Sequence, residues 1–125
     1  FPRDRRPTRP SLSSVMRRWA LGVFALLLVV VGVRGFVAPG HGATSTAPAY
    51  NVFHLSAGTV GSALVLRGDR RAIRWFTVGF GLLDLYQALA SRRHWFPEPW
   101  FRWKPADDRQ HVVLGAALVA VGALP

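Results

Sequence analysis

Four long apolar runs, separated by polar or charged segments, make up most of this chain. They predict helices at about residues 15–38, 51–66, 72–90 and 107–124. Residues 40–50 are rich in Gly, Ser, Thr and Pro and predict a loop, as do residues 91–105. The charged residues 67–71 predict a tight turn. The pattern therefore predicts an all-α domain of four helices.

The first run is the best candidate for a membrane span. It is uncharged from residue 19 to residue 33 and continues apolar beyond Arg34. That makes about 20 residues, which is the length that crosses a bilayer, and an arginine near the end can extend to the interface. A cleaved signal peptide is the alternative, because a basic start and a short apolar run fit one. The other three runs are shorter, so the prediction of four spans depends on their succession and on the charges between them.

The basic residues are unevenly divided between the segments that join the runs. The chain has a formal net charge of +10 and no cysteine, although half of its residues are hydrophobic. Ten of its 16 basic residues lie before residue 19 or in the 67–74 turn. By the positive-inside rule, both termini and this turn are cytoplasmic, whereas loops 39–50 and 91–106 face outward. The predicted location is a bacterial inner membrane, crossed several times.

Residues 1–14 hold four arginines and three prolines and predict a flexible basic tail, outside a transmembrane domain of residues 15–125. A nucleic-acid-binding arm is one interpretation of the tail. Contact with anionic lipid is the other. The neighbouring apolar run favours the second, so we expect a lipid bilayer as partner and no nucleic acid.

A short segment recurs at a constant offset of 57 residues. The matching residues are Pro48 and Pro105, Ala49 and Ala106, Asn51 and Asp108, His54 and His111, and Gly58 and Gly115. A repeat of helix, outward loop and helix predicts two like-oriented hairpins, related by a pseudo-twofold axis along the membrane normal. We therefore expect a four-transmembrane-helix bundle built from two helical hairpins in tandem. Asn51, Asp107 and Asp108 are predicted helix caps, because their side chains can accept from free backbone N–H groups.

His54 and His111 occupy equivalent positions, each about one turn inside its predicted helix. The expected symmetry places them at the same depth, where they could face one another. Two neutral imidazoles could ligate a haem iron, and one alone could ligate a chlorophyll-type magnesium or a zinc. Alternatively, each histidine bonds a loop carbonyl or the opposite hairpin and holds the outer end together, or acts as a pH sensor.

Asp84 lies well inside the third predicted helix, where a carboxylate is costly and marks a candidate functional site. Three interpretations are open. Asp84 forms an ion pair with Arg34, or it orients His54 or His111, or it is protonated and hydrogen-bonded or part of a proton path. Gln87, one turn later, would complete a polar seam with Asp84 and Arg34.

The second outward loop is crowded with aromatic residues, among them Trp95, Trp100, Phe101 and Trp103. An aromatic belt at the membrane interface is one interpretation. The other is a docking surface for another membrane subunit, because Trp is enriched at binding hot spots.

Three motifs carry a resemblance to a known family. They are residues 31–37 (VGVRGFV), the pattern Asn51-x-x-His54-x-x-x-Gly58, and Asp107-Asp108-x-x-His111-x-x-x-Gly115. Together they resemble the small four-helix integral membrane proteins that are catalogued as a domain of unknown function and are frequent in actinobacteria. The resemblance covers roughly residues 15–125. It implies a four-helix fold and a membrane location, and it implies no activity.

Nothing in the sequence predicts an enzyme, because it has no Gly-rich phosphate loop and no nucleophile beside a base. We expect a non-enzymatic integral membrane protein that serves as a small structural or accessory subunit of a larger membrane complex. The alternative is a membrane protein that binds haem or a chlorophyll-type tetrapyrrole through His54 and His111.

Overall fold

The computed structural model describes residues 8–125 and is all-helical over that part of the chain. The helices are α1 (Leu12–Val37), α2 (Pro48–Arg67), α3 (Arg70–Arg93), the single-turn α4 (Glu98–Phe101) and α5 (Pro105–Gly122). Residues 1–7, about half of the predicted basic tail, lie outside the described residues.

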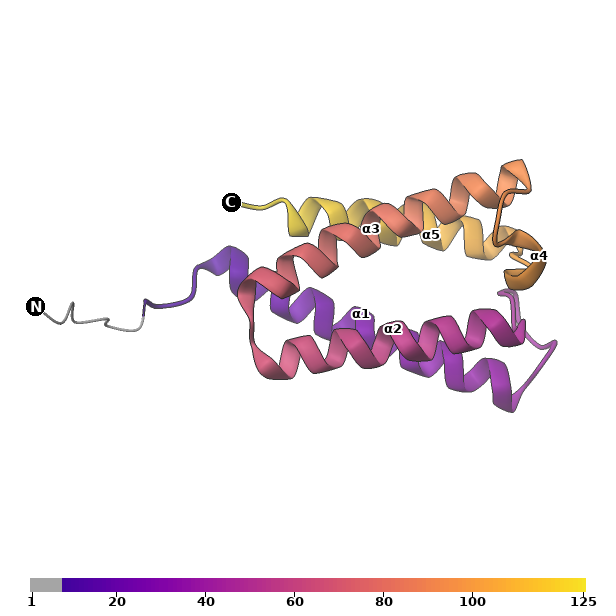
Figure 1. Ribbon diagram of the computed structural model, residues 1–125, viewed down its shortest axis with the longest axis horizontal. Coiled ribbons are helices and arrows are strands. Elements are labelled where there is room, and N and C mark those ends of the chain that lie inside the picture. Colours follow the sequence, from indigo (N-terminus) through magenta and orange to yellow (C-terminus); the bar gives the residue numbers. More distant parts are fainter. Residues whose placement is uncertain (1–7) are drawn as a thin grey trace, which may run out of the picture.

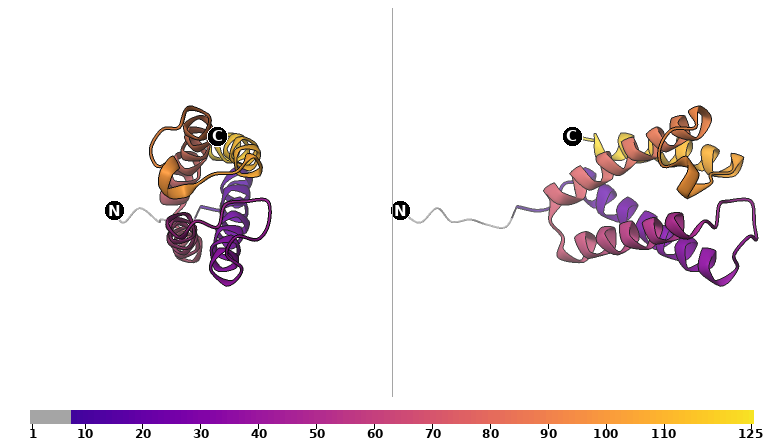
Figure 2. Two further views of the ribbon diagram at one scale, coloured as in Figure 1. Left: turned by 90° about the vertical axis from the view of Figure 1, so that its right-hand side faces the viewer. Right: turned by 45° about the vertical axis from the view of Figure 1, so that its right-hand side comes forward.

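The four long helices form two hairpins, α1 with α2 and α3 with α5, whose axes run roughly the same way (Figures 1 and 2). One end of the bundle, here called the turn end, holds residues 8–11, the α2–α3 turn and residues 123–125 (Figure 1). The opposite end, here called the loop end, holds residues 38–47 and residues 94–104, which include α4. The hairpins therefore present their connecting loops at the same end.

Aromatic and aliphatic side chains join the hairpins along their middle. Phe24 of α1 meets Phe80 of α3 edge-on, with ring centroids 5.2 Å apart, and Phe53 of α2 stacks on Phe80 at 5.7 Å. Leu21, Leu28, Ile73 and Leu118 complete this buried cluster. At the turn end, Arg17 is buried and its guanidinium donates to the Leu124 carbonyl at 2.7 Å, which ties α1 to the C-terminal residues.

Within each hairpin, glycines let the helix backbones approach closely. A Cβ added at Gly58 of α2 would lie 2.8 Å from the Ala25 carbonyl oxygen of α1. A Cβ added at Gly115 of α5 would lie 2.8 Å from the Gly81 carbonyl oxygen of α3. Both distances are shorter than van der Waals contact, so any larger side chain would push the paired helices apart.

Several predicted helix boundaries are wrong, and proline explains two of them. α2 and α5 begin at Pro48 and Pro105, because proline suits the first helical position, where no N–H is needed. Asn51 is consequently inside α2 and does not cap it: the N-cap is Ala47, and the Asn51 amide donates to the Thr46 carbonyl at 3.0 Å.

The first and third helices also start earlier than expected. Ser11 caps α1 by accepting from the Ser14 N–H at 3.1 Å. Asp69 caps α3 by accepting from two backbone N–H groups. The sequence analysis missed α4, which is a single turn inside the predicted aromatic loop.

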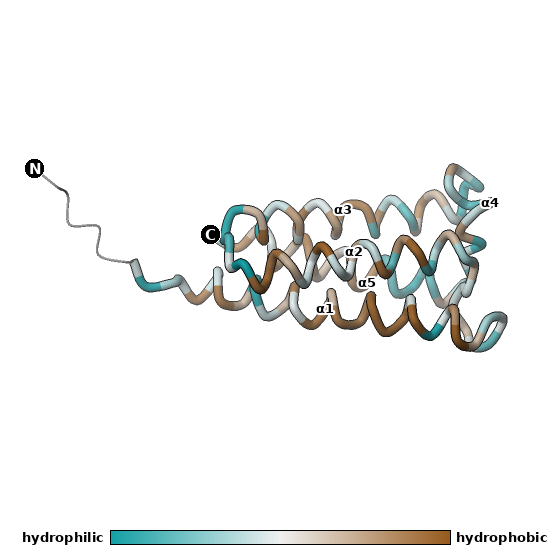
Figure 3. The backbone as a smooth tube through the Cα atoms, turned by 60° about the horizontal axis from the view of Figure 1, so that its bottom comes forward, coloured by the Kyte–Doolittle hydropathy of each residue, from teal (hydrophilic) through white to brown (hydrophobic). Residues whose placement is uncertain are grey.

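One helix within residues 8–125, α1, is long and apolar enough to cross a membrane. Its hydrophobic residues run along most of its length, whereas hydrophilic residues gather mainly at the two ends of the bundle (Figure 3). Polar and charged residues interrupt the other long helices. α3 has arginines in its first and last turns, and α5 has Asp107, Asp108 and Arg109 near its start.

The close glycine contact between α3 and α5 can be tested by replacing glycine with alanine at two positions, one inside the contact and one outside it. We expect Gly115→Ala to destabilise the fold, because the new methyl group would meet the Gly81 backbone. Gly79→Ala in α3 is the control, since a Cβ there has no neighbour within 4 Å and alanine favours a helix. The free energies of unfolding of the two variants should differ by about 2 kcal/mol, measured by thermal unfolding. Equal stabilities would contradict the close packing.

Candidate functional site

The carboxylate of Asp107 is the centre of a hydrogen-bond network at the loop end. Asp107 is buried in the first turn of α5, and its Oδ2 accepts from the backbone N–H groups of Lys104 and Ser45, each at 2.8 Å. The Lys104 bond satisfies a free N–H at the start of α5. The Ser45 bond reaches across to the α1–α2 loop. One carboxylate therefore joins the two hairpins.

Tyr50 extends this network to one of the histidines. The Tyr50 hydroxyl lies 3.3 Å from Asp107 Oδ1 and 2.7 Å from His111 Nε2. All three groups are satisfied if His111 Nε2–H donates to the hydroxyl and the hydroxyl donates to Asp107. His111 Nδ1 is buried and has no partner among residues 8–125. His111 is thus held by the opposite hairpin, which is one of the roles that its position suggested.

His54 lies beside the same tyrosine, one turn further along α2. Its ring centroid is 4.0 Å from that of Tyr50, against 6.1 Å for His111. Both histidines are buried, yet the His54 ring makes no hydrogen bond within the described residues. The structure thus brings the two predicted histidines together around Tyr50, with one ring anchored and the other unanchored.

A pocket of about 470 Å³ lies between the hairpins, lined by His54, His111, Tyr50, Asp84 and Asp107. Its walls are apolar and come from several long helices, with Phe24, Leu28, Phe53, Phe80 and Leu114 as the main contributors. Leu27 of α1 and Val113 of α5 line it from more exposed positions. This combination, apolar walls with a few polar groups at one end, is typical of small-molecule sites. The pocket is here called the loop-end chamber.

Asp84 and Gln87 form a short polar pair in this region, and Arg34 does not join them. Gln87 Nε2 donates to Asp84 Oδ1 at 3.2 Å, and both residues are buried. No ion pair of Asp84 is present within residues 8–125. Arg34 is exposed at the end of α1 and points toward Gly42 in the α1–α2 loop. The predicted ion pair between Asp84 and Arg34 is therefore wrong, because the rotation of α1 directs the arginine away from the bundle.

The remaining predicted site residues divide between surface and interior. Trp95 and Trp100 are 46% and 63% exposed, as a docking surface requires. Trp103 is buried against His111, with ring centroids 6.3 Å apart, so its predicted docking role is wrong. Phe101 is half-buried and packs on Tyr50 at 5.0 Å. The Oδ1 of Asp108 has no hydrogen-bond partner among the described residues, so the predicted cap at Asp108 is not formed.

Sequence analysis missed Tyr50 and Ser45 as parts of the site. The spacing of Tyr50 and His54 was an available signal, because residues four apart lie on the same face of a helix. Ser45 contributes through its backbone N–H and through a side-chain bond to the Phe101 carbonyl. Backbone contacts of this kind depend on loop geometry, which residue types do not reveal.

The two histidines of the chamber differ in the partners of their ring nitrogens. No group of three His, Asp or Glu side chains within the described residues is arranged to hold a metal ion. His111 Nε2 is bonded to Tyr50, whereas His111 Nδ1 and His54 Nδ1 have no partner among the described residues.

Comparison of the chain with protein-family models, with curated proteins and with solved structures gave no match. The family resemblance inferred from the histidine motifs therefore stays a prediction.

The role of Asp107 can be tested by making the same substitution at Asp107 and at the next residue, Asp108, and comparing the two variants. We expect Asp107→Ala to loosen the loop end, because the backbone N–H groups of Lys104 and Ser45 would lose their acceptor. The free energy of unfolding should fall by about 2 kcal/mol, and the Ser45 amide should exchange its hydrogen faster. Asp108→Ala should have little effect on either measurement, since the Asp108 Oδ1 has no partner among the described residues. Equal effects of the two substitutions would contradict the central role of Asp107.

Proposed function

We propose that this chain is a multi-pass integral membrane protein in which all four long helices lie in lipid. The observation that carries the proposal is the distribution of side chains. Large apolar residues are more than 40% exposed on every long helix, for example Leu26 of α1, Val60 of α2, Leu82 of α3 and Val113 of α5. Meanwhile Asn51, His54, Thr77, Asp84, Gln87, Asp107 and His111 are buried. Water would favour the opposite arrangement, whereas lipid favours polar groups inside and apolar groups outside.

The charges at the two ends support an orientation. The turn end gathers arginines, among them Arg18, Arg67, Arg70, Arg71 and Arg74. The loop end mixes basic residues with Glu98, Asp107 and Asp108. The positive-inside rule then assigns the turn end to the cytoplasm of a bacterial inner membrane and the loop end to the outside. The tandem-hairpin repeat fits this orientation, because α2 and α5 both begin at the loop end, 57 residues apart.

Within the membrane, we assign the protein a non-enzymatic role as a small structural or accessory subunit of a larger complex. The exposed aromatic residues Trp95, Phe96 and Trp100 support this role, because they gather at one end and are not covered by the chain's own described residues. Large exposed aromatic side chains are typical of interface hot spots.

A second candidate function is tetrapyrrole binding in the loop-end chamber. The observation that favours it is the unanchored His54 ring on a pocket with mostly apolar walls. His54 would hold the metal of the ring, and Tyr50 and His111 would shape the polar end of the site. A bound haem or chlorophyll-type ring would supply light absorption or electron-transfer chemistry.

The orientation can be tested by cysteine labelling, because the chain has no native cysteine and gives no background. Arg71→Cys at the turn end and Arg92→Cys at the loop end are matched changes at exposed positions. A maleimide that cannot cross the membrane should label Arg92→Cys and Ala43→Cys from outside intact cells. It should label Arg71→Cys only after lysis. Labelling of all three positions from the same side would refute the multi-pass orientation.

The accessory role predicts a partner at the loop end. After extraction in mild detergent, we expect a stoichiometric partner to co-purify with the chain. Trp100→Ala should weaken the binding of that partner by about 2 kcal/mol. Trp75→Ala near the turn end is the matched control, because Trp75 is similarly exposed, at 65% against 63%. A strictly monomeric protein, or equal loss of the partner in both variants, would refute docking through Trp100.

The tetrapyrrole candidate is tested by an absorption spectrum of the purified protein. It predicts a Soret or chlorophyll-type band that His54→Ala abolishes and the exposed-loop variant His41→Ala retains. A colourless protein that also fails to bind added haem or chlorophyll would exclude this function.

A further inference from the structure

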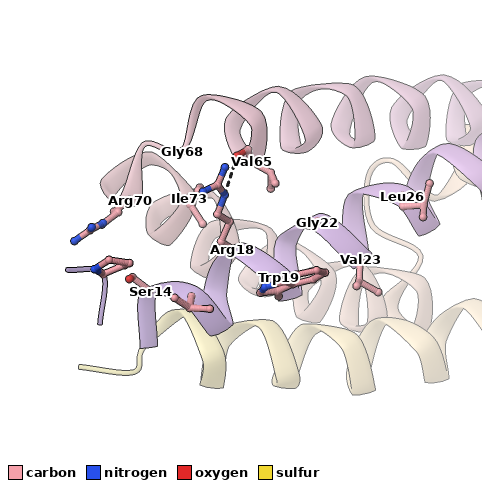
Figure 4. A pocket seen from close by; sticks show the side chains of 12 residues that line it. Ser14, Arg18, Trp19, Gly22, Val23, Leu26, Val65, Gly68, Arg70 and Ile73 are labelled. Atoms are coloured by element: carbon pink, nitrogen blue, oxygen red, sulfur yellow. Dashed lines mark hydrogen bonds between the residues drawn. The ribbon is translucent and has the colours of Figure 1, made fainter. Parts of the chain in front are cut away.

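A groove of about 700 Å³ lies at the turn end between α1, α2 and the start of α3 (Figure 4). Its lining changes character along its length. Ser14, Arg18 and Arg70 give it a polar rim, and Trp19, Gly22, Val23, Leu26 and Val65 give it an apolar trough. Among residues 8–125, no acidic residue lines the groove.

Two guanidinium groups stand at the polar rim. Arg18 Nε donates to the Val65 carbonyl at 3.0 Å, which holds this side chain against α2 (Figure 4). Arg70 donates one N–H to the Thr8 carbonyl at 3.3 Å. Neither arginine pairs with a carboxylate among residues 8–125. Asp69, the acid next to Arg70 in the chain, is engaged in capping α3.

The apolar trough is open along the exposed side of α1. Trp19, Val23 and Leu26 are 73%, 56% and 62% exposed, and they follow one another at helical spacing. Gly22 keeps the trough deep, because the space beside it is empty. A Cβ added there would meet only Val65, at 3.7 Å, which is an ordinary contact. The trough therefore has room for an extended hydrocarbon chain.

We propose that this groove binds one anionic glycerophospholipid of the inner leaflet. Its phosphate lies between Arg18 and Arg70, and one acyl chain follows the trough past Trp19 and Gly22. The guanidinium group of arginine can donate two hydrogen bonds at once to phosphate oxygens. Basic pockets on the cytoplasmic side of membrane helices bind anionic lipid head groups. This assignment rests on the proposed membrane orientation, which puts the turn end at the cytoplasmic face.

The charge requirement is tested by lipid retention, measured by native mass spectrometry of the full chain in detergent. Phosphatidylglycerol and phosphatidylcholine with identical acyl chains are the probes. The double variant Arg18→Gln/Arg70→Gln should retain about thirty-fold less phosphatidylglycerol, because each charge contributes about fivefold. Arg92→Gln/Arg93→Gln removes the same charge at the loop end and should retain as much as the parent chain. Equal losses in both double variants, or no preference for phosphatidylglycerol, would overturn the proposal.

The acyl requirement is tested by Gly22→Leu, which fills the trough and leaves both arginines in place. It should lower phosphatidylglycerol retention about tenfold, and millimolar inorganic phosphate should not displace the lipid. If Gly22→Leu changes nothing and phosphate displaces the lipid, the groove is an anion site only and the lipid assignment is wrong. Circular dichroism of every variant shows whether a loss reflects unfolding. Failure of the membrane orientation is seen separately, in the cysteine labelling, since retention in detergent does not depend on it.

Discussion

The carboxylate of Asp107 is the contact on which the loop end depends. It accepts from Lys104, Ser45 and Tyr50, so it joins the start of α5, the α1–α2 loop and the first turn of α2. Through Tyr50 it also sets the position of His111. The hairpins pack mainly within themselves, and this network is what closes the space between them at one end. In a low-dielectric surrounding, these hydrogen bonds reduce the cost of burying the carboxylate, which would be higher without them.

The two ends of the bundle are built differently. At the loop end, Phe101 and Trp103 pack over Tyr50 and His111 and cover a chamber whose polar groups are turned inward. At the turn end, arginines stand at the surface beside an open apolar groove. This difference fits the proposed orientation, because the cytoplasmic leaflet attracts basic residues and the outer face does not. The proposed orientation, accessory role and lipid site all follow from it.

The number of long helices could be predicted from the sequence, because each corresponds to one apolar run between turn signals. Their starts could not, since Asn51 looks like a cap until Pro48 is known to begin the helix. The meeting of His54 and His111 was inferred from the repeat, yet Tyr50 between them was missed, because its partners lie 57 and 61 residues away. The pairing of Arg34 with Asp84 failed because the rotation of a helix about its axis is set by packing, here by Gly32 and Gly35 against α2.

The central claim is that polar side chains lie inside the bundle and apolar side chains face lipid, and α3 provides its most direct test. This helix is less apolar than α1, yet Leu82 and Leu89 are exposed on its outer surface. A spin label at Leu82→Cys, in the protein reconstituted in lipid, reports collisions with oxygen, which concentrates in the bilayer, and with a water-soluble nickel complex. If the four long helices lie in lipid, oxygen relaxes this label strongly and nickel weakly, and the order reverses at Ala43→Cys in the α1–α2 loop. Nickel relaxation as strong at position 82 as at position 43 would contradict the membrane-embedded bundle.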